Sequence, residues 1–179
     1  MRTSQVLLSP PMNKYIARLS ARAMINNTVM AFIAFFAGYN FTALFHEGTS
    51  QEGGLWSVVS AVMVLESKWS ETSHSAVFRI IGSFLGAAIS GTYLYFYHFS
   101  AIGLAICIGV GVFVCHLLGI TKYVKLTSLT IAVVMIISVI NNDIEPFMNA
   151  ALRFAESVIG TIVAVMVAYV SHLIYSDAK

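Results

Sequence analysis

The chain has 179 residues, of which 58% are hydrophobic and only 10% are charged, and its formal net charge is +2. Its mean hydropathy is +0.82. Soluble domains carry about 25% charged and about 45–50% apolar residues, so these values exclude a water-soluble globular protein and indicate a protein of the bilayer. The length fits a single domain, and no nucleic-acid partner is expected.

The apolar runs predict an all-α polytopic membrane protein, a bundle of about six transmembrane helices. A spanning helix needs about 20 mostly apolar residues. Five runs meet or approach that length: Ala23–Phe45, Ser75–Tyr97, Ala101–Ile120, Tyr123–Ile140 and Phe147–Tyr175. A sixth run, Leu55–Leu65, is too short by itself and extends from Gly53 to Trp69 only by including Glu66 and Lys68. A re-entrant or broken helix is the alternative there.

The expected domain organisation is a cytoplasmic basic amphipathic segment over residues 1–22, a six-span transmembrane domain over 23–175 and a short cytoplasmic tail over 176–179. In the first segment, Lys14, Arg18 and Arg22 recur every four residues and share a helix face. This is typical of a helix on the inner membrane surface, although positive charges that only fix the topology explain it equally well. The first apolar run exceeds the roughly 7–15 residues of a signal-peptide core, so we expect it to be retained.

The positions of Lys and Arg predict that both termini are cytoplasmic. With a cytoplasmic N-terminus, nine of the ten Lys and Arg residues fall on the inner side and only Arg153 falls in the outer half. The outer loops then carry only the acidic residues Glu47, Glu52, Asp143 and Glu145. This asymmetry follows the positive-inside rule, and it requires the short run Leu55–Leu65 to cross. We therefore expect a multi-pass protein of the cell inner (cytoplasmic) membrane.

No enzyme signature is found, because the chain has no phosphate-binding loop, no Gly-x-Ser-x-Gly and no His-Glu-x-x-His. The five histidines are scattered and are typical of interfacial polar residues rather than metal ligands. Cys107 and Cys115 lie eight residues apart in one run, about 12 Å along a helix, which is too far for a disulfide. We therefore expect no catalytic activity, no metal site and no cofactor.

Small residues recur every four positions in three of the predicted spans, Ser75–Tyr97, Ala101–Ile120 and Phe147–Tyr175. Gly82, Gly86 and Ser90 form one stripe, and Gly160 and Ala164 belong to another. Small side chains let membrane helices approach closely, so these five residues are predicted helix-packing positions.

Four ionisable residues lie at or within the apolar runs, where a charge is costly and functional candidates concentrate. Arg153 and Glu156 are three residues apart on one helix face and are expected to pair. Glu66 and Arg79 bracket a short connection near the cytoplasmic side, and they are also expected to pair. Two interpretations stay open: ion pairs that fix helix ends, or arginines that face a water-filled path and attract an anion.

Two segments carry ordered motifs. One is Trp56-Ser-Val-Val-Ser-Ala-Val-Met-Val-Leu-Glu66, followed by Arg79-Ile-Ile-Gly82-Ser83-Phe-Leu-Gly86, and the other is Arg153-x-x-Glu156-x-x-x-Gly160. Together they resemble the signature of the fusaric-acid-resistance-type, or aromatic acid exporter, superfamily, and the first is similar to a pattern of plant aluminium-activated malate transporters. The resemblance implies a membrane path built from paired halves. This chain has the length of one half, so a homodimer is expected.

The predicted function is a membrane transporter, in the exporting direction, for small organic or aromatic acid anions. The candidates for its path or gate are Trp56, Glu66, Lys68, Arg79, Arg153 and Glu156. Trp56 is expected to line or close the outer mouth, and Arg79 to attract the anion with Glu66 as its partner. A passive anion channel and a non-transporting membrane subunit or scaffold are the alternatives. A transporter should bring polar residues together at a cavity, whereas a scaffold should show dry, apolar packing throughout.

Overall fold

The computed structural model describes residues 14–141 and 143–176, with side chains for 21–141 and 143–174. Within these residues the chain is all-helical, with short 3-10 turns at Glu47–Thr49 and Thr121–Tyr123. The helices are α1 (Lys14–Ala43), α2 (Ser50–Val64), α3 (Trp69–Phe96), α4 (Ala101–Leu117), α5 (Val124–Ile140) and α6 (Pro146–Ser176). The predicted all-α bundle of six helices with one short member is confirmed.

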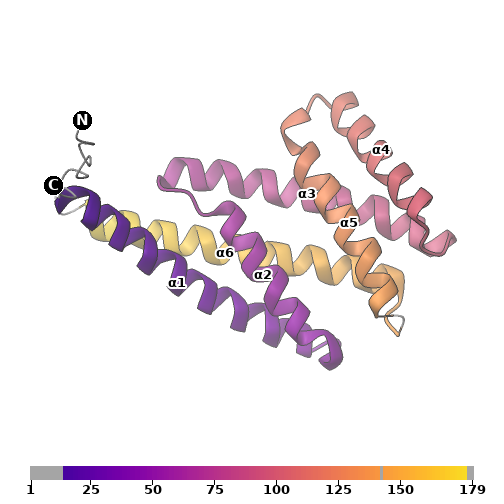
Figure 1. The fold of residues 1–179 in the computed structure, drawn as a ribbon, viewed down its shortest axis with the longest axis horizontal. Helices are drawn as coiled ribbons and strands as arrows, with labels where there is room; N and C mark the ends of the chain where they lie inside the picture. The colour runs from indigo at the N-terminus through magenta and orange to yellow at the C-terminus, as the bar shows by residue number, and fades with distance from the viewer. Residues whose placement is uncertain (1–13, 142, 177–179) are drawn as a thin grey trace, which may run out of the picture.

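The six helices form two groups of three (Figure 1). In the first group α1, α2 and α6 pack against one another, and in the second group α3, α4 and α5 do so. The groups are joined mainly by α3, which packs along α6. In the described residues α2 and α5 do not pack directly against each other, although both lie over the α3–α6 pair. The seam between the groups is therefore bounded by four helices.

The bundle has two apolar clusters, one mainly in each group, and each cluster takes one residue from the other group, Ala76 of α3 and Ala150 of α6. One contains Met30, Ala34, Ala61, Val64, Ala76, Val163 and Ala164, and the other contains Ala87, Leu94, Cys107, Ile131, Val134, Met135 and Ala150. Large apolar side chains also cover the outside of the bundle, with Ile102 75% and Met166 60% exposed. Such exposure is expected where lipid, not water, surrounds the helices.

Four helical segments are long and apolar enough to cross a membrane: Ala21–Ala43, Trp69–Phe96, Thr121–Ile140 and Pro146–Ile174. The helix α4 is apolar but shorter, at 17 residues. The short helix α2 has 15 residues, about 22 Å at 1.5 Å per residue, whereas the hydrocarbon core is about 30 Å thick. It ends where Leu65 turns to an extended conformation.

The start of α3 differs from the prediction. The predicted span begins at Ser75, but α3 already begins at Trp69 and includes Ser70, Glu71 and Thr72. An acidic residue in the first turn stabilises the positive end of the helix dipole, and Glu71 occupies that turn. Hydroxyl and charged residues thus belong to the first turn of the helix and not to a loop. The earlier start places Arg79 ten residues inside α3.

The alternating helices place the loops at two ends of the bundle. Arg22 of α1 donates a hydrogen bond to Ser171 of α6, and the ring of Trp69 in α3 lies 5.3 Å from that of Tyr169 in α6. The start of α1, the start of α3 and the end of α6 therefore share one end (Figure 1). Asn141 donates to Glu52 at the opposite end. Arg22 therefore lies near one end of the bundle and Glu52 near the other, while the side that faces the cytoplasm stays a prediction.

The predicted amphipathic segment is continuous with the first span, because α1 runs without a break from Lys14. Of its three cations, only the side chain of Arg22 is described, and it faces α6 through Ser171. The expectations for residues 1–13 and 177–179 lie outside the described residues.

The glycine stripes pack against protein, as predicted. A Cβ at Gly86 would lie 2.7 Å from the carbonyl oxygen of Thr127 in α5. Gly82 faces α5 in the same way, and Gly160 meets the backbone of Ser57 in α2. Ser90 and Ala164 are fully buried. The stripes therefore set the close approach of α3 to α5 and of α6 to α2.

Candidate functional site

A cluster of polar side chains lies in the seam between the two helix groups. A small pocket there is lined by Trp56 and Ser60 of α2, Arg79 of α3, Leu129, Thr130 and Val133 of α5, and Arg153 and Ser157 of α6. Its volume is about 10 Å³, roughly the space of one water molecule. Four helices thus bring two arginines, three hydroxyls and an indole to one point. We call this the seam pocket.

Arg79 is buried in the seam pocket, and only 4% of the residue is exposed. Its guanidinium donates from Nη2 to the hydroxyl of Ser60 at 2.8 Å and from Nε to the same oxygen at 3.3 Å. A third contact joins Nη1 to the sulfur of Met63 at 3.5 Å. These partners are neutral groups of α2. No ion pair among the described residues joins Arg79 to a carboxylate.

The predicted pair between Arg79 and Glu66 is therefore wrong. Arg79 lies ten residues inside α3, about 15 Å from the helix start, whereas Glu66 follows the end of α2 and is exposed. The backbone N–H of Glu66 donates to the hydroxyl of Thr72 at 3.0 Å. That contact closes the α2–α3 turn without its carboxylate.

The predicted pair between Arg153 and Glu156 is confirmed. Nη1 of Arg153 lies 3.0 Å from Oε2 of Glu156, and their side chains are 1% and 0% exposed. Oε2 of Glu52 lies 3.8 Å from the same Nη1, and its side chain is 30% exposed. Glu52 in turn accepts two hydrogen bonds from Nδ2 of Asn141, both at 2.9 Å. A chain of charged and polar groups therefore runs from buried Glu156 to the acidic end of the bundle.

Three helices enclose Glu156. Thr42 of α1 donates its hydroxyl proton to Oε1 at 2.7 Å, and Ser57 of α2 donates to the backbone carbonyl of Glu156 at 3.1 Å. A Cβ at Gly53 would lie 2.9 Å from Oε1, so this glycine leaves the room that the carboxylate fills. A buried carboxylate costs several kcal/mol unless it is paired and hydrogen-bonded. Thr42 supplies the hydrogen bond at Oε1, and Arg153 supplies the ion pair at Oε2.

Several buried polar atoms of the site have no hydrogen-bond partner within the described part of the chain. They are Nε, Nη1 and Nη2 of Arg153, Oε2 of Glu156 and Nε1 of Trp56. The contact of Arg153 with Glu156 is close, but it lacks hydrogen-bond geometry. Buried donors are almost always paired in proteins. The guanidinium and the indole thus present donors that an acceptor group in the seam pocket would satisfy.

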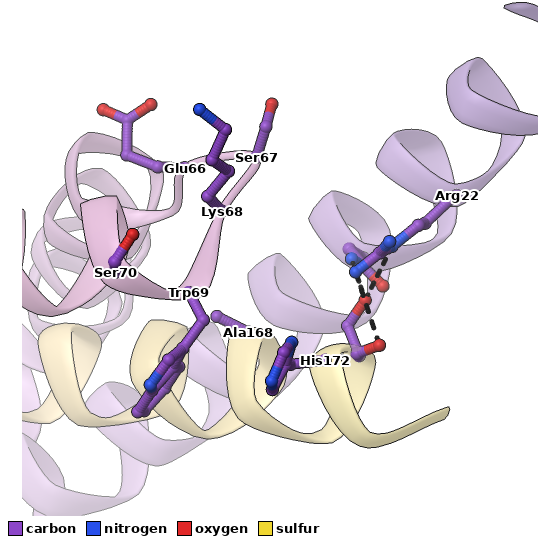
Figure 2. Close-up of a pocket in the computed structure, with 10 residues that line it drawn as sticks. Arg22, Glu66, Ser67, Lys68, Trp69, Ser70, Ala168 and His172 are labelled. Atoms are coloured by element: carbon purple, nitrogen blue, oxygen red, sulfur yellow. Dashed lines mark hydrogen bonds between the residues drawn. The ribbon is translucent and has the colours of Figure 1, made fainter. Parts of the chain in front are cut away.

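Glu66 and Lys68 line a different cavity, at the end of the bundle that holds the first turns of α1 and the last turns of α6. Its volume is about 480 Å³, and Arg22, Trp69 and His172 also line it (Figure 2). Lys68 forms an exposed ion pair with Glu71 at 3.0 Å. An exposed pair of this kind contributes about 1 kcal/mol at most. The six path candidates therefore divide between two places, with Trp56, Arg79, Arg153 and Glu156 at the seam.

Sequence reasoning missed the polar residues that complete the site. In the seam they are Ser60, Thr130, Ser157 and Ser83, which bonds Ser157 at 2.8 Å, and around the Arg153–Glu156 pair they are Thr42, Glu52 and Ser57. A signal exists in α2, where Gly53, Ser57, Ser60 and Val64 recur at helical spacing and are all buried. Two hydroxyls on the buried face of a membrane helix mark a contact with other polar groups.

Length, composition and packing together define a multi-pass membrane protein with a polar seam in its helical bundle. Residues 28–167 match the family model of fusaric acid resistance protein-like proteins, and the chain belongs to that family. The assignment makes it a transporter-like membrane protein, because proteins of this family are transporters rather than enzymes. No curated protein and no solved structure matched the chain. No group of three or more His, Cys, Asp or Glu in the described residues is placed to hold a metal ion.

Proposed function

We propose that this chain exports small organic or aromatic acid anions across the inner membrane, as a homo-oligomer, and that the seam pocket is its anion site. The observation that supports this most is the pair of buried arginines, Arg79 and Arg153, that reach one pocket from different helix groups. A carboxylate between them would accept from the donors of Arg153 and Trp56 that have no partner in the described residues. Guanidinium groups suit carboxylates because they present planar, paired donors.

The polar seam favours a transporter over a scaffold. A protein that only holds others in place needs no buried arginines, and each unpaired charge in a membrane helix costs about 2.5–3.5 kcal/mol on insertion scales. The seam pocket is closed, with room for about one water. Admission of an aromatic acid therefore requires the two helix groups to move apart. The backbones of α2 and α5 do not approach each other closely, whereas α3 packs along α6, so in this proposal the groups part on the α2–α5 side.

The surface formed by α2 and α5 supports the homo-oligomer. The outer rim of the seam pocket consists of Trp56, Leu129 and Val133, which are half-buried, above a floor of buried arginine and serine. A polar site that opened toward lipid would leave its groups without partners in hydrocarbon. A second copy of the chain against α2 and α5 would cover this rim and enclose the path between two halves.

Flux measurements on the purified protein test the anion site. Proteoliposomes are loaded with labelled benzoate at alkaline pH, and empty liposomes give the leak of the neutral acid. We expect Arg79→Gln to lower the protein-dependent flux more than about tenfold, because a hydrogen bond to a charged group contributes about 1.5–3 kcal/mol. Arg79→Lys keeps part of the flux, since the charge remains without the planar fork.

Lys125→Gln serves as the matched control, because it removes one exposed positive charge outside the seam. It should transport benzoate at the rate of the unchanged chain. Full flux from an Arg79→Gln protein of unchanged thermal stability would contradict the proposed site.

A further inference from the structure

The carboxylate of Glu156 has two different oxygens. Oε1 accepts the hydroxyl proton of Thr42 at 2.7 Å. Oε2 lies 3.0 Å from Nη1 of Arg153 and has no hydrogen-bond partner among the residues described. The side chain is fully buried. Oε2 can therefore be in one of two states: it pairs with Arg153 as part of an ionised carboxylate, or it carries a proton.

The charges at the seam balance without any ligand. Arg79 and Arg153 carry two positive charges, and Glu156 and Glu52 carry two negative ones. The charged groups around Glu156 are Arg153 of α6, which contacts it, and Glu52 of α2, which contacts the same Arg153, while Arg79 of α3 lines the seam pocket with Arg153. The helix α1 contributes the hydroxyl of Thr42, and α5 contributes the neutral lining residues Leu129, Thr130 and Val133. A monovalent anion alone would leave one excess negative charge in a poorly hydrated site, which is costly.

We propose that Glu156 is a proton-binding site that is linked to anion binding, so that the protein takes up one proton for each monovalent anion it binds. The proton forms an O–H bond at Oε2, which removes the negative charge that competes with the anion for Arg153. The net charge of the four side chains and the bound anion is then zero again. This inference rests on the proposed function, and it adds the coupling ion to that site.

The arrangement of α2 gives the proton a route. Glu52 is 30% exposed at the acidic end of the bundle, and its Oε2 lies 3.8 Å from Nη1 of Arg153. Asn141 orients the same carboxylate. A proton from that end therefore meets Glu52 first and Glu156 next, since both carboxylates contact Nη1 of Arg153. Movement of the loaded site is electroneutral, so the gradients of the anion and of protons, not the membrane potential, drive it.

Titration calorimetry of the full chain in lipid nanodiscs tests this linkage. The probe is benzenesulfonate, which stays anionic over the whole range from mildly acidic to mildly alkaline pH. Buffers with different ionisation heats report the protons taken up. We expect about one proton per bound anion at alkaline pH, and a dissociation constant that rises about tenfold per pH unit there, because binding linkage is reciprocal.

Three variants locate the proton. Glu156→Gln copies the protonated state, so it should bind benzenesulfonate with the same affinity at every pH and take up no proton. Arg153 still has the carboxylate of Glu52 near it in this variant. Glu156→Asp keeps a titratable group and keeps the pH dependence. Glu47→Gln is the control, since it removes an exposed carboxylate from the same end of the bundle, and it should behave as the unchanged chain does.

The outcomes separate this inference from the function on which it rests. Anion binding by the unchanged chain without proton uptake overturns the inference and leaves the anion site standing. A pH dependence that survives in Glu156→Gln but disappears in Glu52→Gln also overturns it, because the proton then resides on Glu52. Absence of binding at every pH overturns the anion site, and the proton linkage fails with it. The first outcome requires no variant, so a misfolded variant does not prevent a decision.

Discussion

At the scale of single residues, the two arginines show how helix position decides what a charge meets. Arg153 and Glu156 lie one turn apart on α6, so their pairing follows from helical geometry alone. Arg79 and Glu66 are on different elements, and their separation depends on where α3 begins. Its start at Trp69 places Arg79 deep in the bundle beside Ser60, and it leaves Glu66 exposed at the helix end.

Removal of Arg153 is expected to destabilise the protein strongly. Arg153→Met leaves Glu156 as a buried carboxylate without its ion-pair partner, and loss of one member of a buried pair costs about 3–5 kcal/mol. The double variant Arg153→Met with Glu156→Gln should recover part of that loss, because the stranded charge is gone. The free energy of unfolding in mild detergent measures the loss in the single variant and the recovery in the double variant. Lys125→Met, an exposed cation, is the control, and equal stability of Arg153→Met and this control would contradict the prediction.

At the scale of helices, the existence of the long spans could be predicted from the sequence, but the starts of α2 at Ser50 and of α3 at Trp69 could not. Runs of about 20 apolar residues have few alternatives to a membrane helix. The helix boundary at Trp69 depends instead on a first turn of Ser, Glu and Thr, residues that also favour loops. The glycine stripes were predictable as packing positions, although their partners were not, since small residues fit any close neighbour.

Gly160 offers a direct test of the packing between α6 and α2. Gly160 lies one helical turn after Glu156 on α6, and a methyl group there would clash with the backbone of Ser57 in α2. Gly160→Ala should therefore cost about 1–3 kcal/mol through overpacking. Gly109→Ala on α4 is the matched control, because nothing lies within 4 Å of its added Cβ and alanine favours a helix by about 1 kcal/mol over glycine. If both variants unfold at the same temperature in detergent, α6 and α2 are not held by this contact.

At the scale of the whole molecule, the seam joins residues that no local pattern connects. Thr42, Glu52 and Glu156 come from three helices and meet because α6 returns to pack against α1 and α2. Helix packing in membranes depends on shape and a few polar contacts rather than on a hydrophobic stripe. The sequence therefore predicts a bundle and the residue types of a site, while the division into two helix groups requires the three-dimensional structure.

The proposed homo-oligomer follows from the place where the seam pocket meets the surface. A cysteine at Leu129, on the half-buried rim of the pocket, should lie close to its copy if a second chain covers the α2–α5 face. We therefore expect Leu129→Cys to give a covalent dimer with a short bis-maleimide in native membranes. Phe113→Cys on α4, which replaces a side chain that is 66% exposed, is the control for random collisions and should stay monomeric. The parent chain controls for Cys107 and Cys115, which are buried. A monomeric mass in mild detergent, together with full benzoate flux from that monomer, would show that one chain suffices and that lipid borders the seam.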